Sequence, residues 1–264
     1  MQASLILTTY NWKEALFLSL QSALAQSLPP AQILIADDGS REDTAIMIEE
    51  IAKTSPIPLI HVWQEDQGFR LSKIRNEAIK KATTEYIIVS DGDMILHPHF
   101  VRDHLRCAQK RHYIQGGRVL LDEVYSKKLL EKRVFEKPSL FSKHIKNRKN
   151  ALYLPRLSQM ICQKKSQQLK RIRGCNFSLF KEDIYAVNGF NEDFQTWGRE
   201  DSEFVQRLYN KGMHRKDLKF AAIQYHIYHK SGKASSANDA LLEKTIAKRL
   251  TWCENGIDKR ILND

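Results

Sequence analysis

The sequence has few cysteines and no long apolar run. Its 264 residues include 4 cysteines with no Cys-x-x-Cys spacing, so we expect neither a zinc ribbon nor a disulfide framework and interpret the thiols as reduced. Nowhere do about 18 apolar residues follow one another, the length of a membrane-spanning helix. The first residues also lack the basic segment and cleavage site of a secretory signal. These absences predict a cytoplasmic protein.

Proline and glycine are scarce as well. The chain holds 7 prolines and 11 glycines, which excludes a collagen-like or linker-like protein. Hydrophobic residues make up 42% and charged residues 28% of the sequence, a composition typical of globular rather than disordered chains. The length fits one large domain or two small ones.

Positive charge is abundant, and it is concentrated in one segment. The formal net charge is +11, while residues 127–173 alone contain 15 Lys/Arg and 2 Asp/Glu, a balance of +13. The remainder of the chain is therefore slightly acidic, and we expect the partner of this segment to be anionic. Apolar residues persist within it, which predicts helices and a mobile loop rather than a disordered tail.

Short apolar runs alternate with segments of helical spacing over the first 110 residues. The runs lie at 4–9, 32–37, 58–63 and 86–91, and the helical segments at 13–25, 42–53 and 71–82. This order predicts right-handed crossovers and an α/β fold with a mostly parallel sheet flanked by helices. In such sheets ligands bind beyond the carboxyl ends of the strands.

The second half of the chain is less regular. An apolar run at 174–180 is followed by a predicted helix at 200–211 and a predicted strand at 219–225. A C-terminal helix is predicted within 236–253. Four apolar residues would share one of its faces: Leu241, Leu242, Ile246 and Leu250.

Two carboxylates follow the fourth predicted strand, at Asp91 and Asp93. Alternate residues leaving a strand point the same way, so both can face one site. Two oxygen donors on one side suit Mg²⁺ or Mn²⁺ bound together with a substrate phosphate. The pattern alone is more often a solvated Asp-Gly turn than a metal site, but its position after a buried strand improves the case for the metal site.

Polar residues also follow the first two predicted strands. Thr8 and Tyr10 offer a hydroxyl and an aromatic face to a nucleoside, and Asp38 could accept a hydrogen bond from a base or a ribose. Both patterns are as typical of residues that cap helices. Further along, Arg75 belongs to a group of cations around a helix start, which could neutralise a diphosphate or form a solvated basic face.

Two later motifs complete the candidate site. Trp197, Gly198, Glu200 and Asp201 stand where a helix should begin, and a helix N-terminus stabilises a carboxylate that accepts a proton from bound substrate. Simple N-capping is the alternative. His226 and His229 follow the last predicted strand; because residues three apart face opposite sides of a strand, joint metal binding requires a turn between them, and a surface histidine is the alternative.

Together these motifs resemble the family 2 glycosyltransferases of the GT-A fold. The segments that carry the resemblance are TTYN, DDGS, DQGFRLSKIRN, SDGDM and NFSLFKEDIYAVNGFNEDFQTWGREDSEF. The last of them is similar to a C-terminal segment shared by β-1,4-galactosyltransferases and bacterial chondroitin-type polymerases. The likeness covers residues 1–115 and 172–230, and its specificity comes from five motifs in the family's order.

The resemblance implies a role for each candidate residue. Donor-side residues would be Thr8 and Tyr10 at the uridine, Asp38 at the uracil, Asp91 toward the ribose, and Arg75. Mn²⁺ or Mg²⁺ would be bound by Asp93 and His229, with His226 as a further candidate ligand. Asp201 would be the catalytic base, and the acceptor would be bound by Glu200, Trp197 and Gly198. Arg199 and Ser202 depart from the galactosyltransferase pattern.

The resemblance also implies how one GT-A domain is divided. Residues 1–115 would bind the nucleotide sugar, 116–173 would form a basic, partly helical insertion on the acceptor side, and 174–264 would bind the acceptor and carry the catalytic base. The implied reaction is a metal-dependent, inverting transfer of a hexose or N-acetylhexosamine from a UDP-sugar donor to a glycan hydroxyl. The acceptor would be lipid-linked, as in lipopolysaccharide or capsule synthesis, and segment 127–173 would attract either an anionic membrane surface at the inner face of the membrane or a phosphorylated, lipid-linked acceptor.

Two other functions remain open at this stage. A nucleic-acid-binding protein could use segment 127–173, but only Phe135, Phe141 and Tyr153 provide aromatic rings there and no nucleic-acid-binding motif occurs, so no nucleic-acid partner is expected. A sugar nucleotidyltransferase also uses paired aspartates with Mg²⁺. That function gives no role to residues 197–201.

Overall fold

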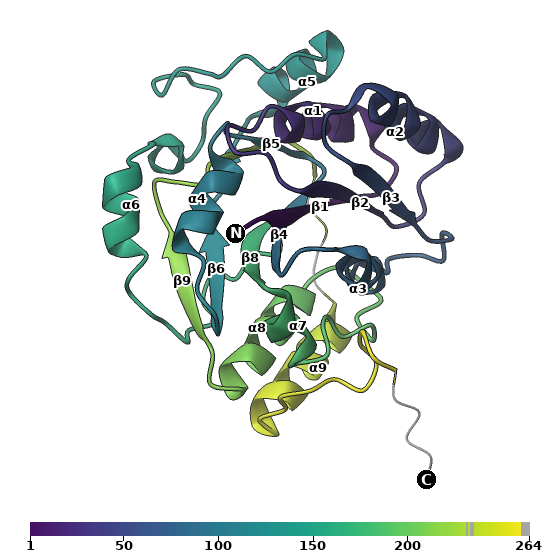
Figure 1. Cartoon of the computed structure of the whole chain (residues 1–264), viewed down its shortest axis with the longest axis vertical. Coiled ribbons are helices and arrows are strands. Elements are labelled where there is room, and N and C mark those ends of the chain that lie inside the picture. The colour runs from purple at the N-terminus through teal and green to yellow at the C-terminus, as the bar shows by residue number, and fades with distance from the viewer. Residues whose placement is uncertain (231, 233–234, 260–264) are drawn as a thin grey trace.

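A seven-stranded sheet forms the centre of the molecule, a computed structural model that describes residues 1–230, 232 and 235–259 (Figure 1). The strand order is β3-β2-β1-β4-β8-β6-β9. In chain order the strands are β1 (Ala3–Thr9), β2 (Gln32–Asp37), β3 (Leu59–Trp63), β4 (Tyr86–Asp91), β6 (His112–Gly116), β8 (Asn176–Phe180) and β9 (His214–Leu218). Only β8 runs antiparallel to its neighbours among these strands, and the predicted mostly parallel α/β sheet is confirmed.

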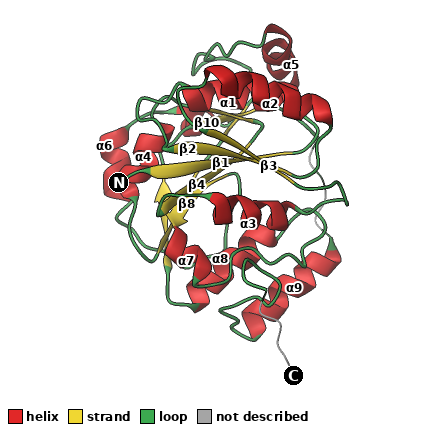
Figure 2. Ribbon diagram, turned by 45° about the vertical axis from the view of Figure 1, so that its right-hand side comes forward, coloured by secondary structure: helices red, strands yellow, loops and turns green. Residues whose placement is uncertain are grey.

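Helices cover both faces of this sheet, as Figure 2 shows. On one face pack α1 (Lys13–Leu24), α2 (Glu42–Thr54) and α4 (Phe100–Cys107). On the other face pack α3 (Leu71–Lys81), α7 (Lys181–Tyr185) and α8 (Glu200–Asn210). The remaining helices are α5 (Glu123–Lys132), a 3-10 helix (Arg148–Ala151), α6 (Pro155–Ile161) and α9 (Ser236–Ala247).

The buried pattern of β1 explains this layering. All of its residues are buried, as expected for a central parallel strand with helices on both sides. Leu5 and Leu7 belong to the core beneath α1 and α4, while Ile6 belongs to the core beneath α3. Successive side chains of a strand point to opposite faces, so a continuous apolar run feeds two cores.

A small second sheet links the end of β4 to the C-terminal half. It contains β5 (Met94–Leu96), β10 (Gln224–His226) and β7 (Val119–Leu120), in that order. β10 pairs antiparallel with β5, and His226 lies opposite Met94. Residues about 130 positions apart in the chain are thereby placed side by side at the edge of the main sheet.

The prediction of a strand over residues 219–225 is wrong. β9 ends at Leu218, β10 begins at Gln224, and the chain between them turns, with positive φ angles at Phe220 (63°) and Ala222 (45°). Side chains from other elements take the backbone bonds of this turn: Asp103 accepts from the Ala222 N–H (3.0 Å), and Asn176 donates to the Ala222 carbonyl (3.0 Å).

The C-terminal helix is shorter than predicted, and the prediction of an apolar face for it is also wrong. α9 ends at Ala247, and its buried residues are Asn238 and Thr245, whereas Ile246 is 44% exposed. Asn238 donates to the carbonyls of Thr196 and Gly198 (2.8 and 2.6 Å). Polar bonds rather than an apolar stripe therefore hold this helix in place.

The helices predicted within segment 127–173 are present as the end of α5, the 3-10 helix and α6. The four cysteines are free and buried, in agreement with the interpretation as reduced thiols. Among the described residues, no helix combines the length and the apolar character needed to cross a bilayer.

Candidate active site

A cavity of about 490 Å³ lies at the carboxyl ends of β1, β2 and β4, where ligands of parallel sheets bind. Most of the residues singled out in the sequence line it: Thr8, Tyr10, Asp38, Asp91, Asp93, Trp197, His226 and His229. They come from both halves of the chain. We call this space the first cavity.

Asp93 lies against both histidines. Nε2 of His226 and Nε2 of His229 are each 3.1 Å from Asp93 Oδ2. The pairing of β5 with β10 sets His226 beside Asp93, and the Ile227 N–H then donates to the Asp93 carbonyl (3.0 Å). The chain leaves the strand at this point and brings His229 back, which supplies the turn that joint metal binding requires.

The electrostatics of Asp93 fit a divalent cation. Burial acts to raise the pKa of this carboxyl group, but hydrogen bonds with His226 and His229 outweigh it and lower the pKa to about 2. Its second oxygen, Oδ1, is buried with no hydrogen-bond partner among the described residues. The three side chains offer ligand atoms within 4.8 Å of one another. An ionised carboxylate and two imidazoles are ligands typical of divalent transition metals.

Asp91 and Gly92 connect the metal cluster to β1. The Thr8 hydroxyl donates to Asp91 Oδ1 (2.8 Å), and the Gly92 N–H donates to the Thr8 carbonyl (2.6 Å). A Cβ atom at position 92 would lie 2.7 Å from that carbonyl oxygen. The close approach of the two backbones therefore requires glycine between the two aspartates.

The two aspartates that end β2 differ in role. Asp37 is fully buried, accepts a hydrogen bond from the Ser40 N–H (2.8 Å) and contacts His61 (2.9 Å). Asp38 lines the first cavity, and its Oδ2 accepts from the Arg70 N–H (2.8 Å). Burial raises the pKa of Asp38, although its hydrogen bonds oppose this. Of the pair, only the second aspartate lines the first cavity.

Tyr10 presents its ring to the same cavity. Its side chain is 52% exposed, and its hydroxyl donates to Asp66 Oδ2 (3.0 Å). The hydrogen bond orients the ring, and about half of the side chain remains exposed at the cavity. A ring held in this way suits the stacking of a base.

A second cavity of about 380 Å³ adjoins the first. It contains Glu200 and Asp201 and shares four lining residues with the first cavity: Leu71, Asp91, Arg118 and Trp197. Asp93 and Asp201 thus face one continuous cleft. We call this space the second cavity.

Arg75 lies buried between the two cavities. Its Nη2 is 3.4 Å from Asp91 Oδ1, its Nη1 is 3.6 Å from Glu200 Oε1, and its guanidinium lies over the Phe190 ring at 5.2 Å. The side chain lines the second cavity and not the first. One cation therefore links Asp91, which lines both cavities, to Glu200 of the second cavity.

Glu200 has an unusual electrostatic environment. Burial raises the pKa of this side chain, the neighbouring Asp201 raises it further, Arg75 opposes both, and the resulting pKa is about 7. Its Oε2 is buried without a hydrogen-bond partner in the described part of the chain. Near neutral pH this carboxyl group exchanges a proton readily.

Asp201 occupies the first turn of α8. Its Oδ1 accepts a hydrogen bond from the Ser202 N–H (2.6 Å), and its other oxygen has no hydrogen-bond partner among the residues described. The turn before α8 uses positive φ angles at Gly198 (101°) and Arg199 (76°). Arg199 adopts a conformation that favours glycine, and its ion pair with Asp239 of α9 (2.6 Å) anchors it there.

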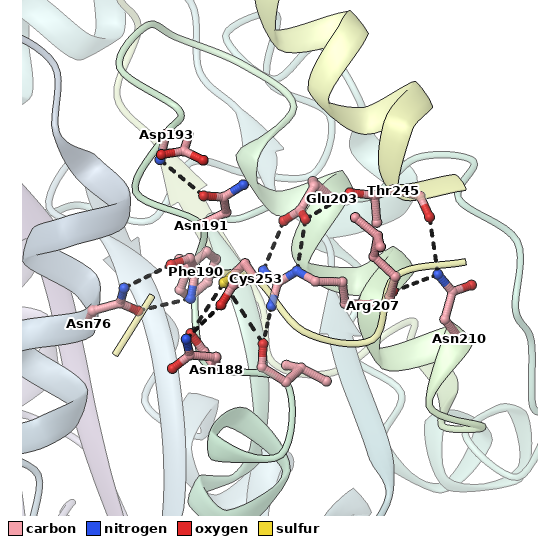
Figure 3. Close-up of polar contacts among 12 residues, drawn as sticks. Asn76, Asn188, Phe190, Asn191, Asp193, Glu203, Arg207, Asn210, Thr245 and Cys253 are labelled. Carbon is pink, nitrogen blue, oxygen red and sulfur yellow. Dashed lines mark hydrogen bonds and ion pairs between the residues drawn. The ribbon is translucent and has the colours of Figure 1, made fainter. Parts of the chain in front are cut away.

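Buried polar contacts hold α8 and α3 in position, as Figure 3 shows. Glu203 and Arg207 of α8 form a fully buried ion pair with distances of 2.8 Å, and Thr245 of α9 donates to Glu203 (3.0 Å). Asn76 donates to the Phe190 carbonyl (2.8 Å) and accepts from its N–H (2.9 Å). The helix that carries Arg75 is thereby fixed to the loop that leads to Glu200.

Three residues of the cleft were not singled out from the sequence. Arg118 lines both cavities and forms no ion pair with any described residue. Arg173 lines the second cavity, and Trp12 packs its ring edge against His229, with centroids 5.8 Å apart. A cation directly after the Gly116-Gly117 pair was a usable signal for Arg118. The other two depend on tertiary contacts.

Comparison with known families gives two matches. The family described as Glycosyl transferase family 2 matches residues 4–186, and the family described as N-terminal domain of galactosyltransferase matches residues 159–230. The first match includes every predicted donor-side residue and Asp93. The second includes Glu200, Asp201, His226 and His229.

Similar proteins include bacterial polysaccharide synthases. A chondroitin synthase of Escherichia coli is 26% identical over 250 residues, which cover 84% of this chain and 34% of the relative. A hyaluronan synthase of Pasteurella multocida is 27% identical, covering 81% of this chain and 23% of the relative. The chain thus spans about a third or less of the length of these two relatives.

A solved structure shares the fold. The crystal structure of S. aureus TarS residues 1–349 in complex with UDP-GlcNAc superimposes with a TM-score of 0.67 at 15% identity, covering 94% of this chain and 66% of that one. At this identity the likeness concerns the fold alone, and the predicted GT-A architecture is confirmed.

Proposed function

Because the chain belongs to glycosyltransferase family 2, we propose that it transfers a hexose or N-acetylhexosamine from a UDP-sugar to a hydroxyl group of a glycan. The observation that carries this proposal is the continuous cleft. At one end lies the Asp93, His226 and His229 cluster, and at the other lies the Glu200 and Asp201 pair. A donor and an acceptor can occupy adjoining spaces there.

The first cavity is the proposed donor site. Tyr10 and Thr8 would line the nucleoside pocket, Asp38 would accept a hydrogen bond from the uracil, and Asp91 would lie toward the ribose. The UDP-GlcNAc complex of the structural neighbour supports a donor of this class. Arg118, which has no carboxylate partner among the described residues, would offer its charge to the diphosphate.

Asp93, His226 and His229 would hold the divalent ion. When bound, the ion supplies positive charge to the diphosphate leaving group. Two imidazole ligands favour Mn²⁺ over Mg²⁺, because Mg²⁺ prefers oxygen ligands and gives up its waters reluctantly.

Asp201 is the proposed base. The acceptor hydroxyl must lose its proton as the new bond forms, and a carboxylate within hydrogen-bond reach contributes about 10²–10⁴ in rate. The unpartnered oxygen of Asp201 is available for that proton, while Glu200, Trp197 and Gly198 would hold the acceptor. A single displacement with one base would invert the anomeric carbon.

The acceptor is proposed to be a lipid-linked glycan at the inner membrane face, as in lipopolysaccharide or capsule synthesis. Segment 127–173 would contribute by attracting anionic headgroups, each nearby cation adding about 1 kcal/mol. Neutralising Lys143, Lys146 and Arg148 should then reduce sedimentation with phosphatidylserine vesicles. Unchanged sedimentation would contradict the membrane contact alone.

The test of the proposed function separates donor binding from transfer. Thermal stabilisation by UDP-sugars in the presence of Mn²⁺ should identify the donor. Asp93→Asn should abolish the metal-dependent part of that stabilisation, whereas Asp201→Asn should keep it and lose transfer. An equal loss of donor binding in both variants would mean that Asp201 is not the base.

A further inference from the structure

A third cavity, of about 580 Å³, continues from the second one. Arg173 lines both spaces. The chain also passes from one to the other at Gly117-Arg118, because Gly117 lines the third cavity and Arg118 the second. The third cavity lies along β6 and β9, beyond the proposed acceptor site. A molecule held at Glu200 and Asp201 can therefore extend into it.

Cations dominate the lining of this cavity. Six basic side chains face it: Lys149, Lys170, Arg171, Arg173, Arg215 and Lys219. Asp217 is the one acidic side chain found there among the described residues, and it pairs with Arg215 (3.1 Å). The other five cations form no ion pair with any described residue, so an excess of positive charge remains. We call this space the cationic groove.

Side chains of β6 and β9 hold the backbone that carries three of these cations through hydrogen bonds. Arg215 Nη1 donates to the carbonyls of Gln168 (3.1 Å) and Lys170 (3.0 Å). Gln115 donates to the Arg171 carbonyl (2.8 Å) and accepts from the Arg173 N–H (3.2 Å). The backbone of the loop is thus hydrogen-bonded to side chains of the sheet. The charged ends of Lys170, Arg171 and Arg173 form no ion pair with any described residue.

Gathering like charges in a concave space costs free energy, and among the described residues Asp217 is the one counter-charge in the groove to offset that cost. A fixed loop that holds such charges is prepared for an anion, because little ordering is left for the moment of binding. The volume suits a ligand of a few sugar units, since pockets of about 300–1,000 Å³ enclose small-molecule ligands.

We propose that the cationic groove binds acidic groups spaced along the acceptor glycan while the end of that glycan lies at Glu200 and Asp201. The inference rests on the proposed function and names the acceptor class: a glycan that carries carboxylate or phosphate groups. The route through Arg173 favours this ligand over a separate polyanion. Phe220 is the one aromatic residue among the described lining, so the groove lacks the row of rings on which single-stranded nucleic acids stack.

A matched pair of variants tests the groove. K170Q/R171Q removes two cations from it, and K164Q/K165Q removes two exposed cations from the same segment outside it. The probes are oligosaccharides of alternating uronic acid and N-acetylhexosamine, a ribitol phosphate oligomer, and a neutral maltooligosaccharide of equal length. Binding is measured calorimetrically without a donor at low and high salt.

At least one acidic probe should bind at low salt at least about tenfold more tightly than the neutral one and weaken in high salt. K170Q/R171Q should weaken it by about tenfold, and K164Q/K165Q by less than about twofold. The two acidic probes separate a carboxylate from a phosphate glycan. Thermal stabilisation by UDP and Mn²⁺ should be the same in both variants, because neither touches the first cavity.

Three results would overturn the inference: equal affinity for the neutral oligosaccharide, equal effects of the two double variants, or equally tight groove-dependent binding of oligonucleotides or phosphatidylserine vesicles. Failure of the wild-type protein to respond to any UDP-sugar would instead count against the proposed donor. The two failures are distinguishable because the glycan measurement contains no donor.

Discussion

Replacing Glu200 by glutamine should make the folded protein more stable at alkaline pH and leave its stability unchanged in mild acid. Glu200 is 7% exposed, and its nearest opposite charge is Arg75, whose Nη1 lies 3.6 Å from Oε1. That guanidinium also serves Asp91. Burial raises the pKa of Glu200 first, the Asp201 charge adds to this, and the shared cation compensates only in part, which leaves the pKa at about 7.

The direction of this pH dependence of stability follows from proton binding. Between the ordinary value of 4.5 and about 7, the folded protein keeps a proton on Glu200 that the unfolded chain has lost. The free energy of unfolding therefore falls as pH rises through this window and levels off above it. At 1.36 kcal/mol per pKa unit, the full loss is about 3 kcal/mol. Glutamine resembles the protonated acid, so Glu200→Gln should gain up to about this amount at pH 8.

Urea denaturation followed by tryptophan fluorescence at pH 5, 6, 7 and 8 measures the effect. The difference between the variant and the wild type should be near zero at pH 5 and should grow through pH 7. Glu49→Gln, at an exposed position of α2 that forms no ion pair with any described residue, provides the control and should show no such trend. A difference independent of pH, or a variant less stable than the wild type at pH 8, would refute the reasoning.

Three further substitutions test the framework of the cleft. His229→Ala should weaken Mn²⁺ binding by at least about tenfold in a spin-resonance titration, while His214→Ala should not. Gly92→Ala would place a Cβ atom 2.7 Å from the Thr8 carbonyl oxygen and should cost about 2 kcal/mol of stability in urea. Glu203→Gln leaves buried Arg207 without its counter-charge and should cost about 3–5 kcal/mol; a loss below about 1 kcal/mol would contradict that account.

The elements predicted correctly are those encoded by local periodicity. The structure reproduces the apolar runs at 4–9 and 86–91 and the helical segment at 71–82 to within a residue or two. In each of them the pattern of apolar residues matches the faces of the element that are buried. The segment 219–225 is equally apolar, but Asp103 and Asn176 take the backbone bonds of Ala222 and the chain turns. A sequence does not display which distant side chain competes for a backbone group.

In the candidate site, too, the sequence pattern locates some residues, while tertiary contacts place the others. Asp38, Asp91 and Asp93 could be located because the carboxyl ends of neighbouring parallel strands meet at one edge of the sheet. The contact between Arg75 and Glu200 joins positions 125 residues apart, and no spacing rule brings them together. The turn that lets His226 and His229 reach one carboxylate depends likewise on the Ile227 to Asp93 backbone bond.

The distribution of charge around Arg75 distinguishes Glu200 from Asp201, the two acids of α8 that line the second cavity. With Asp91, Glu200 and Asp201 all ionised, the second cavity would hold three carboxylates around one buried guanidinium, and burial magnifies their repulsion. A proton retained on Glu200 relieves this repulsion, and Glu200 is the more buried of the two acids of α8 that line the second cavity. In the proposed reaction Asp201, whose Oδ1 accepts a hydrogen bond from the Ser202 N–H at the start of α8, would take the proton from the acceptor. The protonated Glu200 can donate a hydrogen bond to an acceptor oxygen, so the pair would orient a hydroxyl and deprotonate it from the same helical turn.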